Sequence, residues 1–171
     1  MKLKLAAPLL GLILMVGCTS GSADVVLEID QSPLDNAQLA NIEGALENPR
    51  DLEFLGRVIG PQGESFLVTY GQGQYDECYA VFEGSGYSTG CGSLEPPIGG
   101  VVVGQTGDNH YTGLVVDTST DGITAVRVAV NGGQTYEVAP LGALSYITFE
   151  AAEAGFILSL IAGDEVIYQN G

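Results

Sequence analysis

ITAVRVAVNGGQTYEVA, residues 123–139, predicts an antiparallel β-hairpin. Apolar side chains occupy alternate positions on both arms, and these are Val126, Val128, Val130, Tyr136 and Val138. Strict alternation places such side chains on one face of a half-buried pair of strands. The Asn131-Gly132-Gly133 sequence between the arms supplies the positive φ angles that a tight hairpin turn requires. We therefore expect the valine face of this hairpin to be buried.

Similar short strands are expected on both sides of this hairpin. They cover residues 52–58, 66–70, 78–82, 101–103, 111–116, 146–150, 156–161 and 166–169. Clusters of Gly and Pro separate them, notably residues 60–63 and 95–100. Many short strands at this spacing are typical of an all-β sandwich or barrel. We predict a mainly β fold, an antiparallel immunoglobulin-like (Ig-like) β-sandwich over residues 50–171, with one short N-terminal helix.

The short helix is expected over residues 33–48. Ser32 can cap it, Pro33 suits its first position, and Asp35 favours its positively polarised end. Apolar residues follow helical spacing up to Pro49, which ends the segment. We expect a packing element or spacer, with a docking helix for a partner as the alternative.

The first eighteen residues have the three parts of an export signal. Two lysines give a positive start, residues 5–16 form an uncharged apolar run, and the small residue Gly17 precedes Cys18. The run is shorter than the roughly 20 residues that a membrane-spanning helix needs. With its lipobox-like Met15-Val16-Gly17-Cys18 sequence, the segment resembles the signal peptide of a bacterial lipoprotein.

This resemblance implies that residues 1–17 are removed and that Cys18 carries the lipid that anchors the protein to a membrane. Residues 18–32 would form a lipidated tether, in which residues 23–29 are an early strand or an extended leader. The implied location is the extracytoplasmic cell envelope, at the outer membrane if the host is Gram-negative, because Thr19 and not Asp follows the cysteine. An ordinary cleaved signal and an uncleaved anchor are the alternatives.

The chain after the signal is strongly acidic. All 21 Asp and Glu residues lie there, against three arginines (Arg50, Arg57 and Arg127), which leaves a formal charge of −18. Three scattered arginines cannot form the basic patch that binding to nucleic acid needs. The excess indicates solubility or adaptation to salty surroundings, and a specific cationic partner, such as a divalent ion or a basic peptide, is the alternative.

Two cysteines, Cys78 and Cys91, remain after Cys18 is assigned to the lipid. An even pair in an oxidising compartment favours a disulfide bond. The glycine-containing segment between them suits a hairpin or loop. A metal-binding or reactive thiol pair is less favoured, because no His or further Cys is close in the sequence.

Asp121-Gly122-Ile123, the two arms of the hairpin and a closing Ala162-Gly163-Asp164 turn follow this cysteine pair. In this order of residue types, the segment from Leu52 to Gln169 resembles small β-sandwich modules of uncharacterised actinobacterial secreted proteins. The resemblance implies a β-sandwich. It implies no activity, because a shared fold does not carry function.

Few residues are candidates for catalysis or metal binding. Residues 117–122 resemble the first half of a calcium-binding loop, so Asp117, Ser119 and Asp121 are weak metal candidates. Val128 stands where the bidentate glutamate would be, which favours a polar turn between strands. The lone His110 has no accompanying nucleophile or zinc motif and is expected in a surface loop.

A recognition patch could be formed by tyrosines, although their spacing better fits ordinary strand and turn positions. They are Tyr70, Tyr75, Tyr79, Tyr87 and Tyr111.

The sequence thus predicts a lipid-anchored, non-catalytic envelope module, without a cofactor, that binds another protein or a surface polymer. The alternatives are a small hydrolase that uses paired carboxylates and a calcium-dependent adhesion module. A cleft with converging carboxylates would favour the hydrolase, and an exposed apolar or tyrosine-rich patch would favour the binding module.

Overall fold

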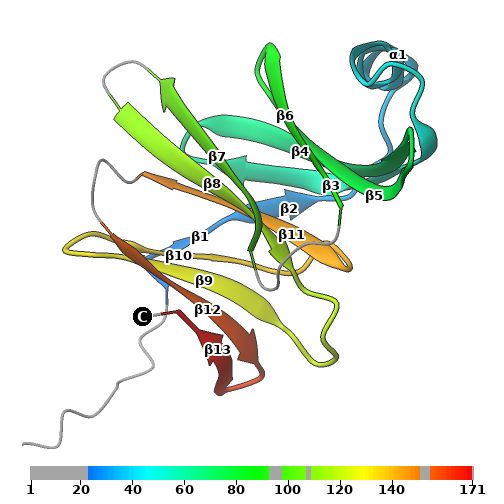
Figure 1. Ribbon diagram of the computed structural model, residues 1–171. Coiled ribbons are helices and arrows are strands. Elements are labelled where there is room, and N and C mark those ends of the chain that lie inside the picture. Colours follow the sequence, from blue (N-terminus) through cyan, green and yellow to red (C-terminus); the bar gives the residue numbers. More distant parts are fainter. Residues whose placement is uncertain (1–22, 93–97, 107–108, 151–154, 171) are drawn as a thin grey trace, which may run out of the picture.

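The computed structural model describes residues 23–92, 98–106, 109–150 and 155–170 (Figure 1). The predicted export segment, Cys18 and the first part of the tether lie outside these residues. Thirteen strands and one helix are described: β1 Val25–Val26, β2 Glu28–Asp30, α1 Asn36–Ala45, β3 Arg50–Gly60, β4 Gly63–Gln72, β5 Tyr75–Glu83, β6 Gly86–Cys91, β7 Ile98–Thr106, β8 Asn109–Asp117, β9 Ala125–Val130, β10 Thr135–Val138, β11 Leu144–Glu150, β12 Phe156–Ala162 and β13 Glu165–Gln169.

The strands form three sheets. The N-terminal sheet has the order β2-β3-β4-β5-β6, the middle sheet β11-β8-β7 and the C-terminal sheet β1-β10-β9-β12-β13. All pairs are antiparallel except β1 with β10. The predicted hairpin is β9–β10, with Val128 opposite Tyr136 and Val126 opposite Val138, all four buried. The predicted mainly β, antiparallel class with one short N-terminal helix is confirmed.

The middle sheet is covered on both faces. Six consecutive residues of β11, from Leu144 to Phe149, are buried. Because neighbouring residues of a strand point to opposite faces, such a run requires packing on both sides. Tyr146 reaches Glu83 in the N-terminal sheet, whereas Phe149 packs edge-on against Phe156 in the C-terminal sheet. One hydrophobic core therefore joins all three sheets, and the arrangement does not by itself establish the Ig-like, two-sheet form of the prediction.

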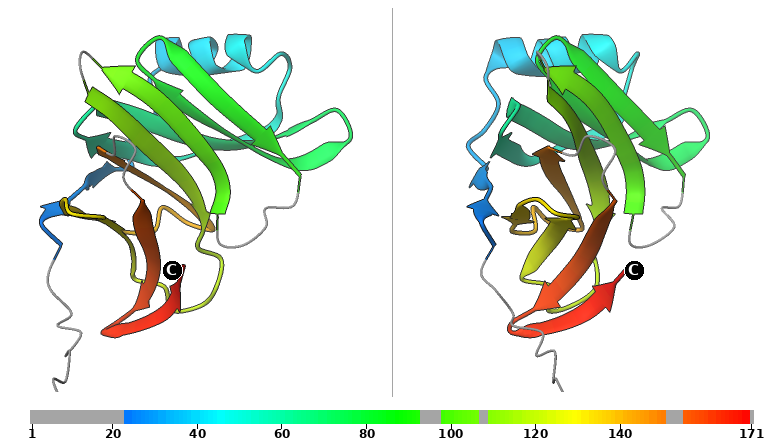
Figure 2. Two further views of the ribbon diagram at one scale, coloured as in Figure 1. Left: turned by 60° about the vertical axis from the view of Figure 1, so that its left-hand side comes forward. Right: turned by 90° about the vertical axis from the view of Figure 1, so that its left-hand side faces the viewer.

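Helix α1 packs on the outer face of the N-terminal sheet, at the opposite end of the molecule from β13 (Figures 1 and 2). Its buried side chain Ile42, together with Leu46 just after it, contacts Val68, Tyr70 and Ala80 of the sheet. The helix is therefore a packing element, which is one of the roles predicted from the sequence.

The prediction that Ser32 caps this helix and Pro33 begins it is wrong. Asp35 is the N-cap, and its carboxylate accepts hydrogen bonds from the backbone N–H groups of Ala37 and Gln38. The Gln38 side chain accepts the Asp35 N–H in return, which completes a capping box. The carbonyls of Ser32 and Pro33 instead accept hydrogen bonds from Arg57, so this dipeptide lies before the helix and not within it.

Arg57 fastens the N-terminal segment to the N-terminal sheet. Its side chain is 8% exposed and lies between the rings of Phe54 and Phe66, 5.3 and 5.4 Å from their centroids. The guanidinium forms ion pairs with Asp30 on β2 (3.1 Å) and Glu64 on β4 (2.9 Å). One side chain thus connects β2, β3, β4 and the segment that leads into α1.

Candidate functional site

A cleft of about 500 Å³ lies between the N-terminal and middle sheets. It is bordered by the first residues of β3, β5 and β11 and by the last residues of β4 and β8. Five carboxylate side chains line it, and they belong to Asp51, Glu53, Asp76, Glu77 and Asp117. No basic side chain is among the described residues that line it. The cleft is therefore the place where the acidic excess of the chain is concentrated in a concave surface.

Strand register explains how these carboxylates come together. Glu53 lies opposite Thr69, and Thr69 lies opposite Tyr79, so all three share the inner face of the N-terminal sheet. Glu77, two residues before Tyr79, belongs to the same face. Across the cleft, Asp117 pairs with Leu144 on the middle sheet. Carboxylates from two facing sheets thus line one cavity, and Tyr79 and Leu144 provide its apolar wall.

Irregular pairing occurs on the N-terminal-sheet side of the cleft. The register shifts between Arg50 and Glu53 in the β3–β4 pair and between Tyr70 and Gln72 in the β4–β5 pair. Asp51, inside the first irregularity, has a φ of +50°. Such bulges bend a strand and increase its local twist.

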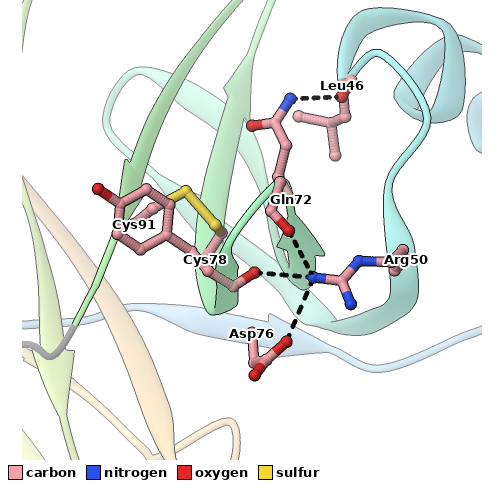
Figure 3. The surroundings of a disulfide bond; sticks show 8 residues. Leu46, Arg50, Gln72, Asp76, Cys78 and Cys91 are labelled. Atoms are coloured by element: carbon pink, nitrogen blue, oxygen red, sulfur yellow. Dashed lines mark hydrogen bonds and ion pairs between the residues drawn. A yellow bond between two sulfur atoms is a disulfide. The ribbon is translucent and has the colours of Figure 1, made fainter.

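Arg50 lies at the rim of the cleft and points toward Asp76 (Figure 3). Its Nη2 atom donates to the carbonyls of Gly73 and Tyr75 and to the Asp76 carboxylate, each at 3.2 Å. These contacts close the β4–β5 hairpin and balance one of the five negative charges. In the described part of the chain, the other four lining carboxylates form no ion pair.

The disulfide predicted from the sequence joins Cys78 and Cys91 beside this site (Figure 3). The two cysteines lie opposite each other in the β5–β6 pair. Cys78 is buried in the small core where α1 packs on the sheet. The bond therefore fixes β6 to the strand that carries Asp76 and Glu77.

The calcium candidates are only partly brought together. Asp117 and Ser119 line the cleft, and the Ser119 N–H donates to the Asp117 carboxylate at 2.8 Å in a local turn. Asp121 is exposed and is not among the lining residues. Across the described residues, no group of three or more His, Cys, Asp or Glu side chains is placed to hold a metal ion.

His110 is exposed, as expected, but it lies in strand β8 and not in a loop. The five tyrosines do not form one patch: Tyr70 and Tyr79 are buried, whereas Tyr75 and Tyr87 are exposed on separate strands. In the part of the chain that the structure covers, no helix is long and apolar enough to cross a membrane.

A second polar cluster is closed by its own hydrogen bonds. The Glu83 carboxylate accepts from the hydroxyls of Tyr111, Tyr146 and Ser65. Burial, followed by the bond to Glu83, raises the pKa of Tyr146 well above its usual value. The cluster connects the N-terminal and middle sheets and is best explained as a structural contact.

Comparison of the chain with protein-family models, curated proteins and solved structures finds no match in any of the three. The resemblances to bacterial lipoproteins and to actinobacterial modules therefore remain predictions that depend on the residues quoted for them.

Proposed function

We propose that the protein is a lipid-anchored module of the cell envelope that binds a cationic ligand in the acidic cleft and does not catalyse a reaction. The observation that carries this proposal is the set of five carboxylates around one cavity, of which Arg50 at the rim balances only one. A cleft lined by charges of one sign focuses the electric field and attracts counter-charged ligands. The ligand class is therefore a Lys- or Arg-bearing peptide segment or an amine-bearing surface polymer.

The size and lining of the cleft suit an extended chain with basic side chains. A volume of about 500 Å³ falls in the range typical of small-ligand sites and is too small for a folded domain. The alkyl stem of a lysine or arginine can lie along Tyr79 and Leu144 while its charged end meets Glu53, Glu77 or Asp117.

The anchor and the cleft would face different directions. The described chain begins just before β1, and all three views show β1 on the opposite side of the molecule from the β4–β5 hairpin that borders the cleft (Figures 1 and 2). A tether ending at Cys18 would leave the cleft open to ligands away from the membrane. The Cys78–Cys91 disulfide supports an oxidising compartment. We also propose an Ig-like sandwich for this fold, formed by the N-terminal and middle sheets, with the C-terminal sheet as an added layer.

Mass spectrometry of the protein extracted from its native envelope tests the anchor. We expect an N-terminal fragment that begins at a diacylglycerol-modified Cys18, and we expect the Cys18→Ser variant to leave the membrane fraction. An unacylated chain that still begins at Met1 would contradict the anchoring proposal.

Binding in the cleft can be measured by fluorescence anisotropy with a labelled Lys/Arg-rich peptide and a Glu-rich peptide of equal length. The double variant Glu53→Gln/Glu77→Gln removes two cleft charges. With roughly 0.2–1 kcal/mol for each exposed ion pair, it should weaken binding by about 2- to 30-fold. The matched control, Glu28→Gln/Glu43→Gln, removes two exposed charges outside the cleft and should have little effect. Equal losses in both variants would show non-specific attraction and contradict the proposal.

A hydrolase is the second candidate, because Glu53 and Glu77 on the N-terminal sheet line the same cavity as Asp117 on the middle sheet. Two carboxylates on opposite sides of a bond are what acid–base hydrolysis of a glycoside requires. Soluble oligosaccharides and peptidoglycan fragments, incubated with the wild-type protein, provide the test. Turnover that is lost in both Glu53→Gln and Glu77→Gln would replace the binding proposal, and absence of turnover would remove this candidate.

A further inference from the structure

Strand β13 is an unprotected edge of the C-terminal sheet. It pairs with β12 on one side and is the last strand in the order of that sheet. All five of its residues are exposed, including Val166 (54%), Ile167 (44%) and Tyr168 (37%). The strand thus carries three consecutive large apolar residues that are all exposed.

Soluble proteins usually protect such edges with lysine, proline, inward-pointing charge or very short strands. β1, at the other edge of the same sheet, has only two residues. β13 contains no lysine or proline, and its one charged residue, Glu165, is at its start. The register shift at Ile161 leaves Ile167 without a residue opposite it in β12, and its side chain remains exposed. The irregularity therefore does not cover the apolar surface.

We propose that β13 is the contact between two copies of this chain, which pack antiparallel about a two-fold axis near Ile167. When placed antiparallel, the strand and its flanks are complementary to a second copy of themselves. The acidic end, Asp164 and Glu165, would lie against the amide end of the second copy, Gln169 and Asn170. The apolar residues would meet each other in the middle. A parallel pair would instead place the acidic ends side by side, which is unfavourable.

The contact is separate from the acidic cleft, which lies between the other two sheets, so a dimer would leave both clefts open. Because each copy is strongly acidic, repulsion between the bodies opposes association at low salt. Salt screens this repulsion, so we expect the dimer to become tighter as the salt concentration rises.

Sedimentation velocity of the purified full chain over a range of concentrations is the first test. We expect a reversible monomer–dimer equilibrium that Ile167→Lys weakens at least tenfold, since two like charges would oppose each other at the axis. Val26→Lys is the matched control, because Val26 is 70% exposed on the opposite edge of the same sheet. This control should dimerise like the wild type, and circular dichroism should show that both variants are folded.

Cysteine substitution tests the two-fold axis. Ile167→Cys should form a disulfide-linked dimer under mild oxidation, because the two copies of this residue are neighbours across the axis. Glu165→Cys should not, since its two copies would be about 13 Å apart, beyond the Cα separation of about 4.4–6.8 Å that a disulfide allows.

A chain that stays monomeric at every concentration and salt level would overturn the proposal. So would a dimer that Ile167→Lys leaves intact, or cross-linking that is as efficient from position 165 as from 167. If Ile167→Cys in the native envelope were captured only by a different protein, the assignment of a second copy would be wrong.

Discussion

Replacing Arg57 by alanine should reduce the free energy of unfolding by about 3–5 kcal/mol. Hydrogen bonds to charged groups contribute about 1.5–3 kcal/mol each when buried. The side chains of Asp30 and Glu64 are 40% and 46% exposed, so water can replace part of what Arg57 gives them. We therefore assign about 2–3 kcal/mol to the polar contacts together. The two aromatic contacts, with Phe54 and Phe66, add about 0.5–1 kcal/mol each.

Equilibrium unfolding in urea, followed by circular dichroism because the chain has no tryptophan, measures this loss. For a domain of this size, 1 kcal/mol corresponds to about 2–4 °C, so the melting temperature should fall by about 6–20 °C. Arg57→Lys should lie between the wild type and Arg57→Ala. It keeps the charge but loses the planar group that stacks between the rings and bonds several acceptors.

Arg50→Ala is the matched control, because it removes the same side chain from an exposed ion pair. The side chains of Arg50 and Asp76 are 51% and 88% exposed, so this variant should cost less than about 1 kcal/mol. If Arg57→Ala were no more costly than Arg50→Ala, burial would not decide the strength of these contacts. Our explanation of how the N-terminal segment is held would then be wrong.

Substitutions at three further sites test the same structure. Tyr146→Phe should cost about 1.5–3 kcal/mol, because its hydroxyl donates to Glu83. Burial raises the pKa of Tyr146, so the protonated hydroxyl stabilises the fold below the ordinary pKa of 10, and this contribution is lost at higher pH. Tyr146→Phe should therefore flatten the alkaline side of the curve of unfolding free energy against pH. Removing the disulfide in Cys78→Ser/Cys91→Ser should cost about 3 kcal/mol in urea unfolding, given the sequence separation of 13. Hydrogen bonds from Ser32, with a smaller effect of Arg57, lower the pKa of Asp30 below 3.8. Its contribution is therefore present at higher pH and is lost as the pH falls through the lowered pKa, so Asp30→Asn should flatten the acid side of the stability curve.

Alternation of apolar residues predicted the strands wherever one face of a sheet is buried. The β9–β10 hairpin is the clearest case, because its valines and its Asn-Gly-Gly turn indicate the same structure. The sequence of β6, Gly86–Cys91, has no such alternation, and it predicts only a hairpin or loop between the two cysteines. It forms a strand because β5 pairs along its whole length and the disulfide joins the two strands at Cys91.

The cleft could be predicted only in part. The sequence predicts Asp117 and Ser119 as weak calcium ligands, and both line the cleft. Glu53 and Glu77 lie far from them in the sequence, and only the pairing of β3 and β5 through β4 places them on the same face. Alternation with Tyr79 was the one available signal for Glu77. The approach of the middle sheet, which brings Asp117 opposite, depends on packing between sheets and leaves no local pattern.

The glycines show why composition alone was misleading. The Gly- and Pro-rich sequence of residues 95–100 predicts a boundary between strands, yet Gly100 lies inside β7. A Cβ atom on Gly100 or on Gly90 would collide with the Tyr79 ring, and one on Gly113 would collide with Tyr146. Each ring therefore occupies the space of a missing side chain, which allows the N-terminal and middle sheets to approach closely. Because the Tyr79 ring is held between two glycine backbones and also forms a wall of the cleft, the packing that joins the sheets also fixes the shape of the proposed binding site.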